Sequence, residues 1–313
     1  MKGKRLVIGS RKSKLAMIQA ELVMGRLKKA YPDMDIEIKT ISTKGDKILD
    51  TPLSKIGDKG LFTKEIEEAL LREEIGLAVH SIKDLPTGLP HGLKIGAITL
   101  REEPCDVLVS RQGAALKGLP ENAKIGTSSL RRRAQLLHFR GDLDIADLRG
   151  NLDTRIKKME DGSYDAIVVA YAGVARFGLE SLPSLYKIPY DIMLPQAGQG
   201  ALGIEVRDGD EDMADIASKL DDEDARIAVS AERALLAGLE GGCQIPIGVY
   251  AEVKGEDIYI RAGVFSLDGK VAVKNGLTGK SRDCEILGRQ LAENMLKNKD
   301  VNMILDELIG GIE

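Results

Sequence analysis

Positively charged side chains in this sequence follow directly after short apolar runs. Arg11 follows the run RLVIGS, Arg131 and Arg132 follow KIGTSS, and Arg149 follows DIADL. In sheets built mainly from parallel strands, ligands bind at the carboxyl ends of the strands, where these side chains are expected to lie. The planar guanidinium group of arginine binds carboxylates and phosphates through two parallel hydrogen bonds. The spacing therefore predicts a ligand that carries several carboxylate or phosphate groups.

Other residues extend this predicted anion site. We assign Arg155 to it as well, whereas we interpret Arg133 and Lys157 as solvated surface charges. The N-terminus of a helix offers unpaired N–H groups and the positive end of the helix dipole, so hydroxyl groups placed there would complete an anion site. The hydroxyl residues at such positions are Ser13, Thr127, Ser128 and Ser129.

The segment HSIKDLP, residues 80–86, adds a carboxylate to these basic residues. Asp84, next to Lys83, is open to two interpretations. On a solvated surface the two residues form an ion pair that contributes little stability. In a cleft, Asp84 acts as an acid–base group or as the counterion of a developing cation, and the residues alone do not decide. His80 lies within an apolar run, so we expect it to pack or to hydrogen-bond structurally.

Cys243 lies in the loop EGGCQIPIG, residues 240–248, and not in a periodic apolar segment. Gly241 and Gly242 admit positive φ, and Pro246 stops any helix from continuing, so the loop is shaped to display the thiol. A nucleophile or a redox-active thiol is the chemistry that such a loop suggests by itself.

The remaining cysteines do not suggest a metal site or a disulfide framework. Cys105, Cys243 and Cys284 are far apart in the sequence and include no C-x-x-C pair. This spacing disfavours both disulfide bonds and a thiolate zinc site. With only three histidines in the chain, we expect no metal centre.

Two irregular segments are expected to move or to approach a ligand. TKGDKILDTPLSKIGDKG, residues 43–60, has no periodicity and predicts a long mobile loop. Phe62 follows that loop and is either a core aromatic or part of a lid over a flat ligand. The glycine-rich turn PQAGQGALGIE, residues 195–205, lacks the lysine of a P-loop, so we interpret it as a hinge or as backbone that approaches the ligand closely.

Composition excludes several classes of function. The 313 residues contain 45 Lys and Arg against 49 Asp and Glu, a net charge of -4, which disfavours binding of nucleic acid through phosphate neutralisation. No apolar run approaches the roughly 20 residues that span a bilayer, and the basic N-terminus has no signal-peptide core. We therefore expect a cytoplasmic protein without membrane or nucleic-acid partners.

Strand and helix patterns alternate through most of the chain. Such alternation predicts an α/β fold with mainly parallel sheets in two halves, and the run 200–207 is expected to return to the first half. From about residue 221 the pattern changes to a long helix, three antiparallel strands with an Asp-Gly hairpin turn, and two closing helices, which predicts a smaller α+β domain. The strands predicted for the two halves are 5–10, 36–42, 77–82 and 93–99, then 106–111, 124–129, 144–150 and 166–173.

Eight motifs in order resemble the porphobilinogen deaminase family, also called hydroxymethylbilane synthases. They are GSRKSKLAMIQA, GDKGLFTKEIE, HSIKDLPTGLP, IGTSSLRRRAQL, LRGNLDTRIKK, AYAGVARFG, PQAGQGALGIE and AERALLAGLEGGCQIPIG. The resemblance implies two α/β domains similar to type II periplasmic binding proteins around a cleft, and a third α+β domain with a three-stranded antiparallel sheet. The implied domains are residues 1–103 with 197–219, residues 104–196, and residues 220–313.

The resemblance also implies a transferase of tetrapyrrole biosynthesis. It implies a dipyrromethane cofactor linked through a thioether to Cys243. Onto this primer the family condenses four porphobilinogen molecules head to tail with release of ammonia, and hydrolysis then frees hydroxymethylbilane. The small molecule is the only partner implied, no metal is needed, and we expect a monomer without an obligatory protein partner.

The same resemblance assigns roles to individual residues. Asp84 is the catalytic residue, which stabilises a cationic pyrrole and moves protons. The cofactor-binding residues are Ser81, Lys83, Asp84, Thr127, Ser128, Ser129, Arg131 and Arg132. The substrate-binding residues are Arg11, Ser13, Gln19, Arg149, Arg155 and Arg176. The lid residues are Lys59 and Phe62.

Two other classes of protein compete with this interpretation. Two α/β halves around an anion cleft also serve solute-binding or effector-sensing modules, which would bind the anion unchanged and would not need Cys243. A redox sensor would instead need a Cys243 thiol that reacts readily with alkylating agents.

Overall fold

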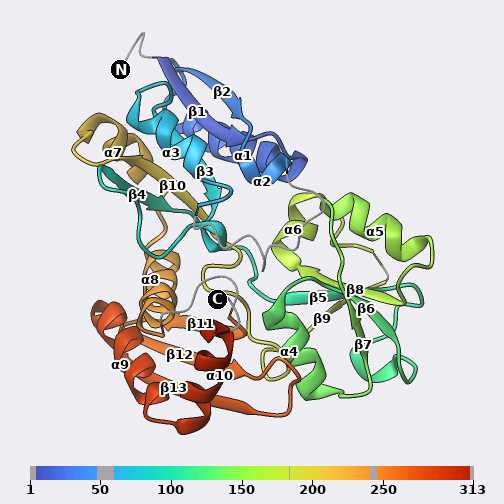
Figure 1. The fold of residues 1–313 in the computed structure, drawn as a ribbon. Helices are drawn as coiled ribbons and strands as arrows, with labels where there is room; N and C mark the ends of the chain where they lie inside the picture. The colour runs from blue at the N-terminus through green and yellow to red at the C-terminus, as the bar shows by residue number, and fades with distance from the viewer. Residues whose placement is uncertain (1–4, 48–59, 183, 240–244, 311–313) are drawn as a thin grey trace. The chain divides into compact units, whose positions relative to one another are not determined.

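The computed structural model describes residues 5–47, 60–182, 184–239 and 245–310. The chain divides into two compact units, each of which is described by itself (Figure 1). Unit 1 contains the described residues within 5–47, 60–102 and 200–226. Unit 2 contains the described residues within 103–182, 184–199, 227–239 and 245–310.

Unit 1 is built on a five-stranded mixed sheet with the order β2-β1-β3-β10-β4. β1 runs parallel to β2 and β3, whereas β10 is antiparallel to both β3 and β4. The position of β10 confirms that the run 200–207 returns to the first half of the chain. The strands are β1 (Arg5–Arg11), β2 (Asp35–Ile41), β3 (Leu77–Ser81), β4 (Leu93–Ile98) and β10 (Leu202–Arg207).

Helices pack on both faces of this sheet. Leu6, Ile8 and Leu77 are almost completely buried between the sheet and α1, and Ile66 and Leu70 of α3 belong to a second apolar cluster. The segment predicted as a mobile loop begins with a short helix, α2 (Lys44–Lys47), and its residues 48–59 lie outside the described residues. The other helical segments are α1 (Lys14–Ala30), α3 (Lys64–Leu71), η2 (Ile82–Asp84) and α7 (Glu211–Ser218).

The first sheet of unit 2 repeats the pattern of unit 1. Its order is β7-β6-β8-β5-β9, in which β6 is parallel to β7 and β8, and β5 is antiparallel to β8 and β9. The strands are β5 (Asp106–Ser110), β6 (Lys124–Gly126), β7 (Asp144–Ala146), β8 (Ala166–Ala170) and β9 (Leu185–Lys187). The helical segments are η3 (Leu116–Gly118), α4 (Leu130–Phe139), α5 (Leu152–Glu160) and α6 (Tyr171–Arg176).

Three details of this sheet differ from the sequence prediction. The strand predicted at 166–173 ends at Ala170, because Tyr171 already begins α6. β9 was not predicted, because three residues are too short for a period-two pattern to be seen. β6 and β7 end earlier than predicted, since the hydroxyl and arginine residues that follow them have left the sheet. The predicted helices after β6, β7 and β8 are present as α4, α5 and α6.

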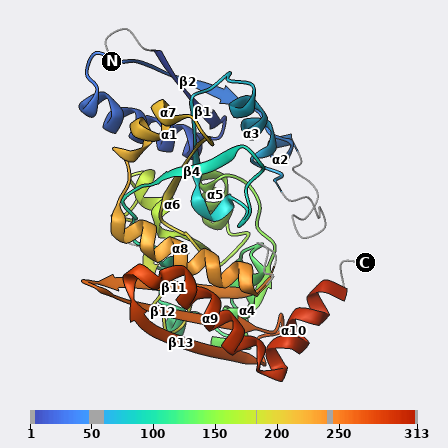
Figure 2. The ribbon, with the colours of Figure 1, turned by 90° about the vertical axis from the view of Figure 1, so that its left-hand side faces the viewer.

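The last part of unit 2 is a three-stranded antiparallel sheet with the order β11-β12-β13. Figure 2 shows α8 and α9 against this sheet, and buried apolar side chains from α8, α9 and α10 pack on its strands. The hairpin predicted at Asp268 and Gly269 connects β12 and β13. The elements are α8 (Glu223–Gly238), β11 (Ile247–Lys254), β12 (Asp257–Phe265), β13 (Ala272–Lys280), η4 (Ser281–Asp283), α9 (Cys284–Leu296) and α10 (Lys299–Gly310).

The predicted fold class is confirmed, with two five-stranded α/β sheets and a smaller three-stranded antiparallel sheet covered by helices. The domain boundaries and the cleft between the two α/β sheets stay predictions.

Candidate functional site

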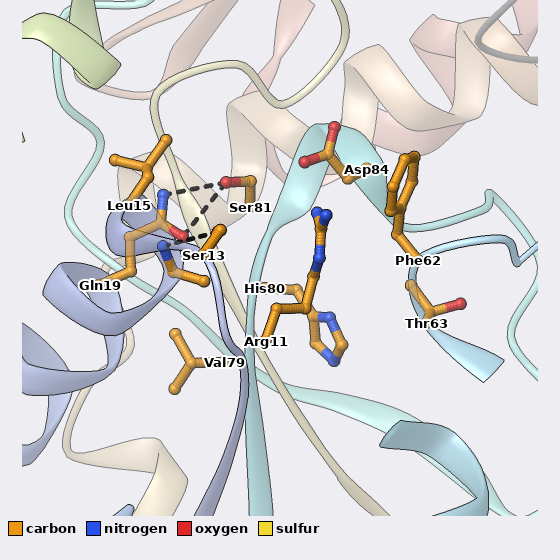
Figure 3. Close-up of a pocket in the computed structure, with 11 residues that line it drawn as sticks. Arg11, Ser13, Leu15, Gln19, Phe62, Thr63, Val79, His80, Ser81 and Asp84 are labelled. Carbon is orange, nitrogen blue, oxygen red and sulfur yellow. Dashed lines mark hydrogen bonds between the residues drawn. The ribbon is translucent and has the colours of Figure 1, made fainter. Parts of the chain in front are cut away.

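A pocket in unit 1 gathers many of the residues that the sequence singles out. Its volume is about 60 Å³ (Figure 3). β1 and β3 are parallel neighbours, so Arg11 at the end of β1 and Ser81 at the end of β3 emerge at the same edge of the sheet. The lining residues are Arg11, Ser13, Leu15, Ala16, Gln19, Phe62, Thr63, Val79, His80, Ser81 and Asp84.

The N-terminus of α1 forms one wall of this pocket. Ser13 caps the helix, and its hydroxyl oxygen accepts a hydrogen bond from the backbone N–H of Ala16 at 3.3 Å. Gln19 is buried, and its Nε2 donates to Ser81 Oγ at 3.0 Å. This bond connects α1 to the end of β3, so Ser13, Gln19 and Ser81 are held as one wall.

Arg11 has a protein partner that the sequence analysis missed. Its guanidinium group forms an ion pair with Asp46 of α2 and lies 4.2 Å from the centroid of the Phe62 ring. Asp46 also accepts hydrogen bonds from the hydroxyl and the backbone N–H of Thr43. Burial acts to raise the pKa of Asp46, but the hydrogen bond and charge of Arg11, together with the bonds from Thr43, lower it overall. A ligand carboxylate at Arg11 must therefore share the guanidinium group with Asp46 or displace Asp46 from it.

Asp84 is exposed at the end of η2, and Lys83 beside it is half-buried. η2 follows β3 directly, and Ile82 anchors this turn in the core because its side chain is almost completely buried. Figure 3 shows the Asp84 carboxylate and the Arg11 guanidinium extending toward the same side of the pocket. A carboxylate and a cation thus share one small volume, as the acid–base interpretation of Asp84 requires.

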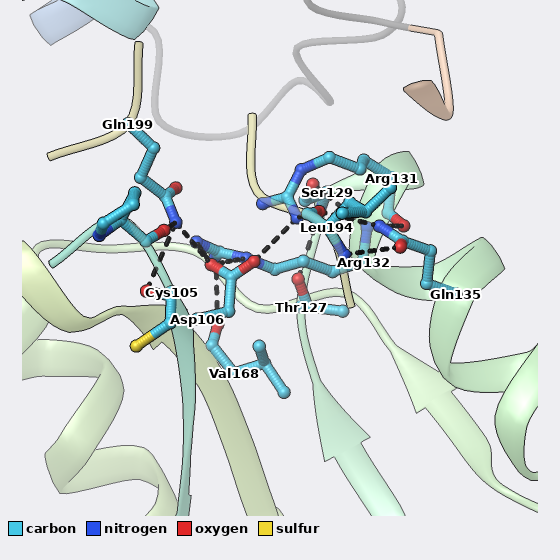
Figure 4. Close-up of polar contacts among 11 residues, drawn as sticks. Cys105, Asp106, Thr127, Ser129, Arg131, Arg132, Gln135, Val168, Leu194 and Gln199 are labelled. Atoms are coloured by element: carbon cyan, nitrogen blue, oxygen red, sulfur yellow. Dashed lines mark hydrogen bonds and ion pairs between the residues drawn. The ribbon is translucent and has the colours of Figure 1, made fainter. Parts of the chain in front are cut away.

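Arg131 and Arg132 of unit 2 converge on one buried carboxylate, Asp106 (Figure 4). Arg131 Nη1 lies 2.6 Å from Asp106 Oδ2, and Arg132 Nη2 lies 2.8 Å from Asp106 Oδ1. Arg131 also donates to the carbonyl oxygen of Leu194, and Arg132 donates to that of Val168. Both guanidinium groups are therefore fixed in position by strand β5, together with strand β8 for Arg132 and the segment at Leu194 for Arg131.

The electrostatics of this cluster favour an additional anion. Burial acts to raise the pKa of Asp106, but the charges of Arg131 and Arg132 lower it well below its usual range. Burial also lowers the pKa of Arg131. Two guanidinium groups face a single carboxylate, so the cluster carries excess positive charge in the interior. Asp106 was not predicted, although an aspartate that opens a buried apolar strand is the signal that could have revealed it.

The glycine-rich turn after residue 195 docks on the same cluster. Gln199 Nε2 donates to Asp106 Oδ1 at 3.0 Å and to the carbonyl oxygen of Pro104 at 2.7 Å. The turn is therefore tied through a side chain to the carboxylate that holds the arginines, and its predicted use as a hinge or as backbone close to the ligand stays a prediction.

The predicted hydroxyl residues shape the loop between β6 and α4. Ser129 caps α4 by accepting from the backbone N–H of Arg132, and Thr127 Oγ1 accepts from the backbone N–H of Ser129 at 3.2 Å. Ser128 Oγ donates to the carbonyl oxygen of Leu148 and accepts from its N–H. These bonds tie the segment after β6 to the segment after β7.

Arg149 follows Leu148 directly and lies within electrostatic range of Arg155 in α5. Burial, followed by the charges of Arg132 and Arg149, lowers the pKa of Arg155 to about 10. Arg155 Nε donates to the carbonyl oxygen of Gly150 at 2.7 Å. The structure thus brings arginines from α4, the loop after β7 and α5 into one positive field, and Arg176 is half-buried at the end of α6.

The residues interpreted as surface charges behave as predicted, since Arg133 and Lys157 are exposed. Burial raises the pKa of the Cys105 thiol to about 12 and also raises that of Cys284, which suits ordinary thiols. Among the described residues, no group of three or more His, Cys, Asp or Glu side chains is arranged to hold a metal ion.

Cys243 and Lys59 lie outside the described residues. The chain on either side of the Cys243 loop is described, because α8 ends at Gly238 and β11 begins at Ile247. Ile245 lines a cavity of about 20 Å³ together with Ser129 and Arg131. The segment that leaves the cysteine loop therefore lies against the arginine cluster of unit 2.

The fold and these sites define an α/β protein with clustered arginines at the carboxyl ends of its strands, an arrangement suited to a small molecule with several anionic groups. Comparison with known sequences identifies the family. The family model for "Porphobilinogen deaminase, dipyromethane cofactor binding domain" matches residues 6–215, and that for "Porphobilinogen deaminase, C-terminal domain" matches residues 226–297. The chain belongs to the porphobilinogen deaminase family.

Curated relatives agree over almost the whole chain. The porphobilinogen deaminase of Chlorobaculum tepidum is 50% identical over 94% of this chain and 95% of its own length. That of Pelotomaculum thermopropionicum is also 50% identical, over 94% of both chains, and that of Chlorobium chlorochromatii is 52% identical over 94% of this chain and 95% of its own.

Two solved structures resemble the chain more distantly. The BenM effector-binding domain matches with a TM-score of 0.42 at 16% identity, covering 70% of this chain and 91% of its own. The binding protein YtmK of Bacillus subtilis matches with a TM-score of 0.41 at 12% identity, covering 70% of this chain and 90% of its own. Within the described residues, no helix combines the length and apolarity needed to cross a bilayer.

Proposed function

We propose that this chain is a transferase that joins four porphobilinogen molecules head to tail with release of ammonia and then releases the linear tetrapyrrole hydroxymethylbilane by hydrolysis. The observation that carries the proposal is the excess of arginine over carboxylate at the carboxyl ends of the unit 2 strands, where Arg131 and Arg132 share Asp106 and Arg155 lies in the field of Arg132 and Arg149. Every pyrrole ring of the substrate carries an acetate and a propionate, so the growing product needs a binding site that is rich in arginine.

We further propose that the dipyrromethane cofactor is joined through a thioether to Cys243. The residues next to the Cys243 loop suit the dipyrromethane cofactor, because Arg131 and Ser129 line the same cavity as Ile245. Arg131 Nε is buried and has no hydrogen-bond partner among the described residues, so it is a donor for a cofactor carboxylate. When bound, the cofactor supplies the pyrrole carbon onto which the chain grows.

The unit 1 pocket would orient the incoming molecule and move its protons. Arg11 would bind a substrate carboxylate in competition with Asp46, while Gln19 and Ser81 form the opposite wall. Asp84, exposed at the pocket, would stabilise positive charge on the pyrrole nitrogens and accept the proton that coupling releases. Phe62, stacked on Arg11, would cover the pocket together with Lys59.

Intact-protein mass spectrometry tests the cofactor proposal. Wild-type protein should carry an adduct of two linked pyrrole units, and C243A should lack both the adduct and activity. C284A is the matched control and should keep both. Active wild-type protein of unmodified mass would refute the tether. Size-exclusion chromatography and cell fractionation test our predictions of a monomer in the cytoplasm.

A further inference from the structure

Three titratable side chains from three elements meet in the interior of unit 1, behind the pocket. His80 of β3 is 5% exposed, Glu205 of β10 is completely buried, and Glu67 of α3 is 6% exposed. His80 Nε2 lies 3.1 Å from Glu205 Oε2, an ion-pair distance between neighbouring antiparallel strands. We call these three residues the His80 cluster.

The polar atoms of the His80 cluster are poorly satisfied. Among the described residues, neither carboxylate oxygen of Glu205 has a hydrogen bond of good geometry, and the same holds for Glu67 Oε1 and His80 Nε2. A buried polar atom without a partner is costly and is found chiefly where it serves a function. Packing of the sheet alone therefore does not account for these three side chains.

Charge counting shows that the cluster must hold protons. Two ionised carboxylates beside a neutral imidazole would place two negative charges in the interior, at a prohibitive desolvation cost. Two added protons make the cluster neutral, and one of them can reside on His80 or on Glu205 without changing the net charge. In agreement, burial and then the charge of Glu205 raise the pKa of Glu67, although a hydrogen bond with Thr63 and the charge of His80 oppose the shift.

Charged groups on the elements packed around the cluster are largely engaged elsewhere. On β1, Arg11 pairs with Asp46 of α2, and on β10, Arg207 pairs with Asp210. Glu65, which lies on α3 like Glu67, accepts a hydrogen bond from the backbone N–H of Lys44. Among the described residues that line the pocket, the charged or titratable groups beside His80 are Arg11 and Asp84, so Asp84 on η2 is the group with which the cluster would exchange protons.

The cluster has access to that pocket. His80 and Thr63 both line it, together with Arg11 and Asp84. Figure 3 shows the His80 imidazole beneath Arg11, with Asp84 toward the opposite end of the pocket. His80 and Asp84 therefore face the same pocket from different surroundings. Such an arrangement allows one group to act as an acid and the other as a base.

We propose that the His80 cluster is a proton relay, in which His80 exchanges a proton with the pocket and Glu205 and Glu67 hold that proton in reserve. The proposal rests on the proposed function. In each coupling a C–H bond of the terminal ring and the C–N bond of the incoming molecule break, and a C–C bond forms. The proton from the ring ends on the amine nitrogen, which leaves as ammonia, so the protons balance. Asp84 would accept this proton, and His80 would deliver the proton that the amine takes up.

The pH dependence of turnover tests the relay. E205Q keeps the shape of glutamate and H80Q keeps the polarity and approximate size of histidine, but neither variant can carry the proton at that position. We therefore expect kcat to fall at least tenfold and one limb of its pH profile to vanish or move by at least one pH unit. KM should stay within about threefold, because Arg11 remains in place. H91Q is the matched control, since His91 is an exposed histidine of the same unit, and its profile should be that of wild type.

A lower kcat with an unchanged pH profile would show a structural role and overturn the proposal, as would unchanged kcat in both variants. If H80Q and E205Q fail to fold, E67Q should show the same displacement of the profile, and an unchanged profile there would also refute the relay.

A second measurement does not depend on turnover. The chain has three histidines, so the His80 ring resonance can be assigned by NMR with H91Q and H138Q. Its response to pH should differ between wild type and E205Q, because His80 Nε2 lies 3.1 Å from Glu205 Oε2. Identical titrations in wild type and E205Q would refute the coupling. If wild type consumes no porphobilinogen and carries no adduct, the proposed function fails, and this titration still tests the cluster.

Discussion

At the residue scale, three of the arginines proposed to bind the ligand are held by carboxylates of the protein. Asp46 pairs with Arg11, and Asp106 pairs with Arg131 and Arg132. A guanidinium group held in this way is already positioned when a ligand carboxylate arrives, so less side-chain entropy is lost on binding. The arginine positions are evident in the sequence, whereas their partners are not. Asp46 lies 35 residues from Arg11 and Asp106 lies 25 residues from Arg131, and no local pattern links residues at such separations.

Asp84 carries the sharpest prediction at this scale. D84N removes the negative charge and the proton acceptor but keeps the size of the side chain, so kcat should fall by about 10²–10⁴-fold. KM should change little, because Arg11, Ser13 and Gln19 remain in place. Steady-state kinetics with porphobilinogen measure both parameters, and D84E should retain intermediate activity. A D84N enzyme with near-normal kcat would show that Asp84 is only a surface charge.

At the element scale, the central strands and most helices follow from apolar periodicity, glycines and prolines. What the sequence does not reveal is how an element end is secured. The loop after β6 is held by Ser128 on Leu148, and the N-terminus of α4 is held by Asp106 of β5. Both depend on tertiary proximity, which periodicity does not encode. For the same reason the short strand β9 was missed, since it exists only by pairing with β5.

Asp106 should be a major determinant of stability, because it joins α4 to β5. D106N leaves two buried guanidinium groups without their counter-charge. Breaking a buried ion pair in this way should lower the free energy of unfolding by about 3–5 kcal/mol. D142N is the control: it breaks the surface pair of Asp142 with Arg140 and should change stability little. Urea denaturation at pH 7 measures both variants. Equal stability of D106N and D142N would contradict the assigned role.

The same pair predicts a pH dependence. The pKa of Asp106 is lower in the folded than in the unfolded protein, so its stabilising contribution is present above the ordinary aspartate pKa of about 4. This contribution is lost as the pH falls toward the folded-state pKa. The difference in unfolding free energy between wild type and D106N should therefore be constant from about pH 7 to 5 and shrink below about pH 4. A difference that stays constant down to pH 3 would refute the linkage.

The two hairpin turns of the three-stranded sheet offer a matched pair. Gly255 and Gly269 both have positive φ, at 62° and 72°. A Cβ at Gly255 would meet nothing within 4 Å, whereas one at Gly269 would lie 2.4 Å from the backbone nitrogen of His138. G255A should thus lower the free energy of unfolding by about 1–2 kcal/mol through conformational strain alone. G269A adds a clash, so it should lower the free energy of unfolding by about 2–5 kcal/mol in total. Thermal or urea unfolding distinguishes the two variants. Equal losses of unfolding free energy would show that the hairpin at Gly269 does not pack against His138 of α4.

At the scale of the whole molecule, an acidic protein is proposed to bind an acidic substrate. The net charge of -4 repels a carboxylate at long range, so attraction must come from the local excess of arginine in unit 2. Each unit also repeats one sheet pattern, with a serine-capped helix after the first parallel strand, α1 behind Ser13 and α4 behind Ser129. Repetition of this element gives each unit a serine-capped helix end, where a helix N-terminus can bind an anion, and this would suit the proposed ligand with carboxylates on every ring.

Ionic strength tests this local attraction. Added salt shortens the Debye length from about 10 Å at 0.1 M to about 3 Å at 1 M, so the attraction between the arginines and the substrate carboxylates should weaken and KM for porphobilinogen should rise. R155Q removes one arginine of the positive field and should raise KM by about tenfold or more, the loss expected for a charge-assisted hydrogen bond. It should also flatten the salt dependence, because less charge remains to be screened. R133Q is the matched control from the exposed face of α4, and it should leave both KM and its salt dependence as in wild type. Equal effects of R155Q and R133Q would mean that overall charge, and not the local arginine field of unit 2, governs substrate binding.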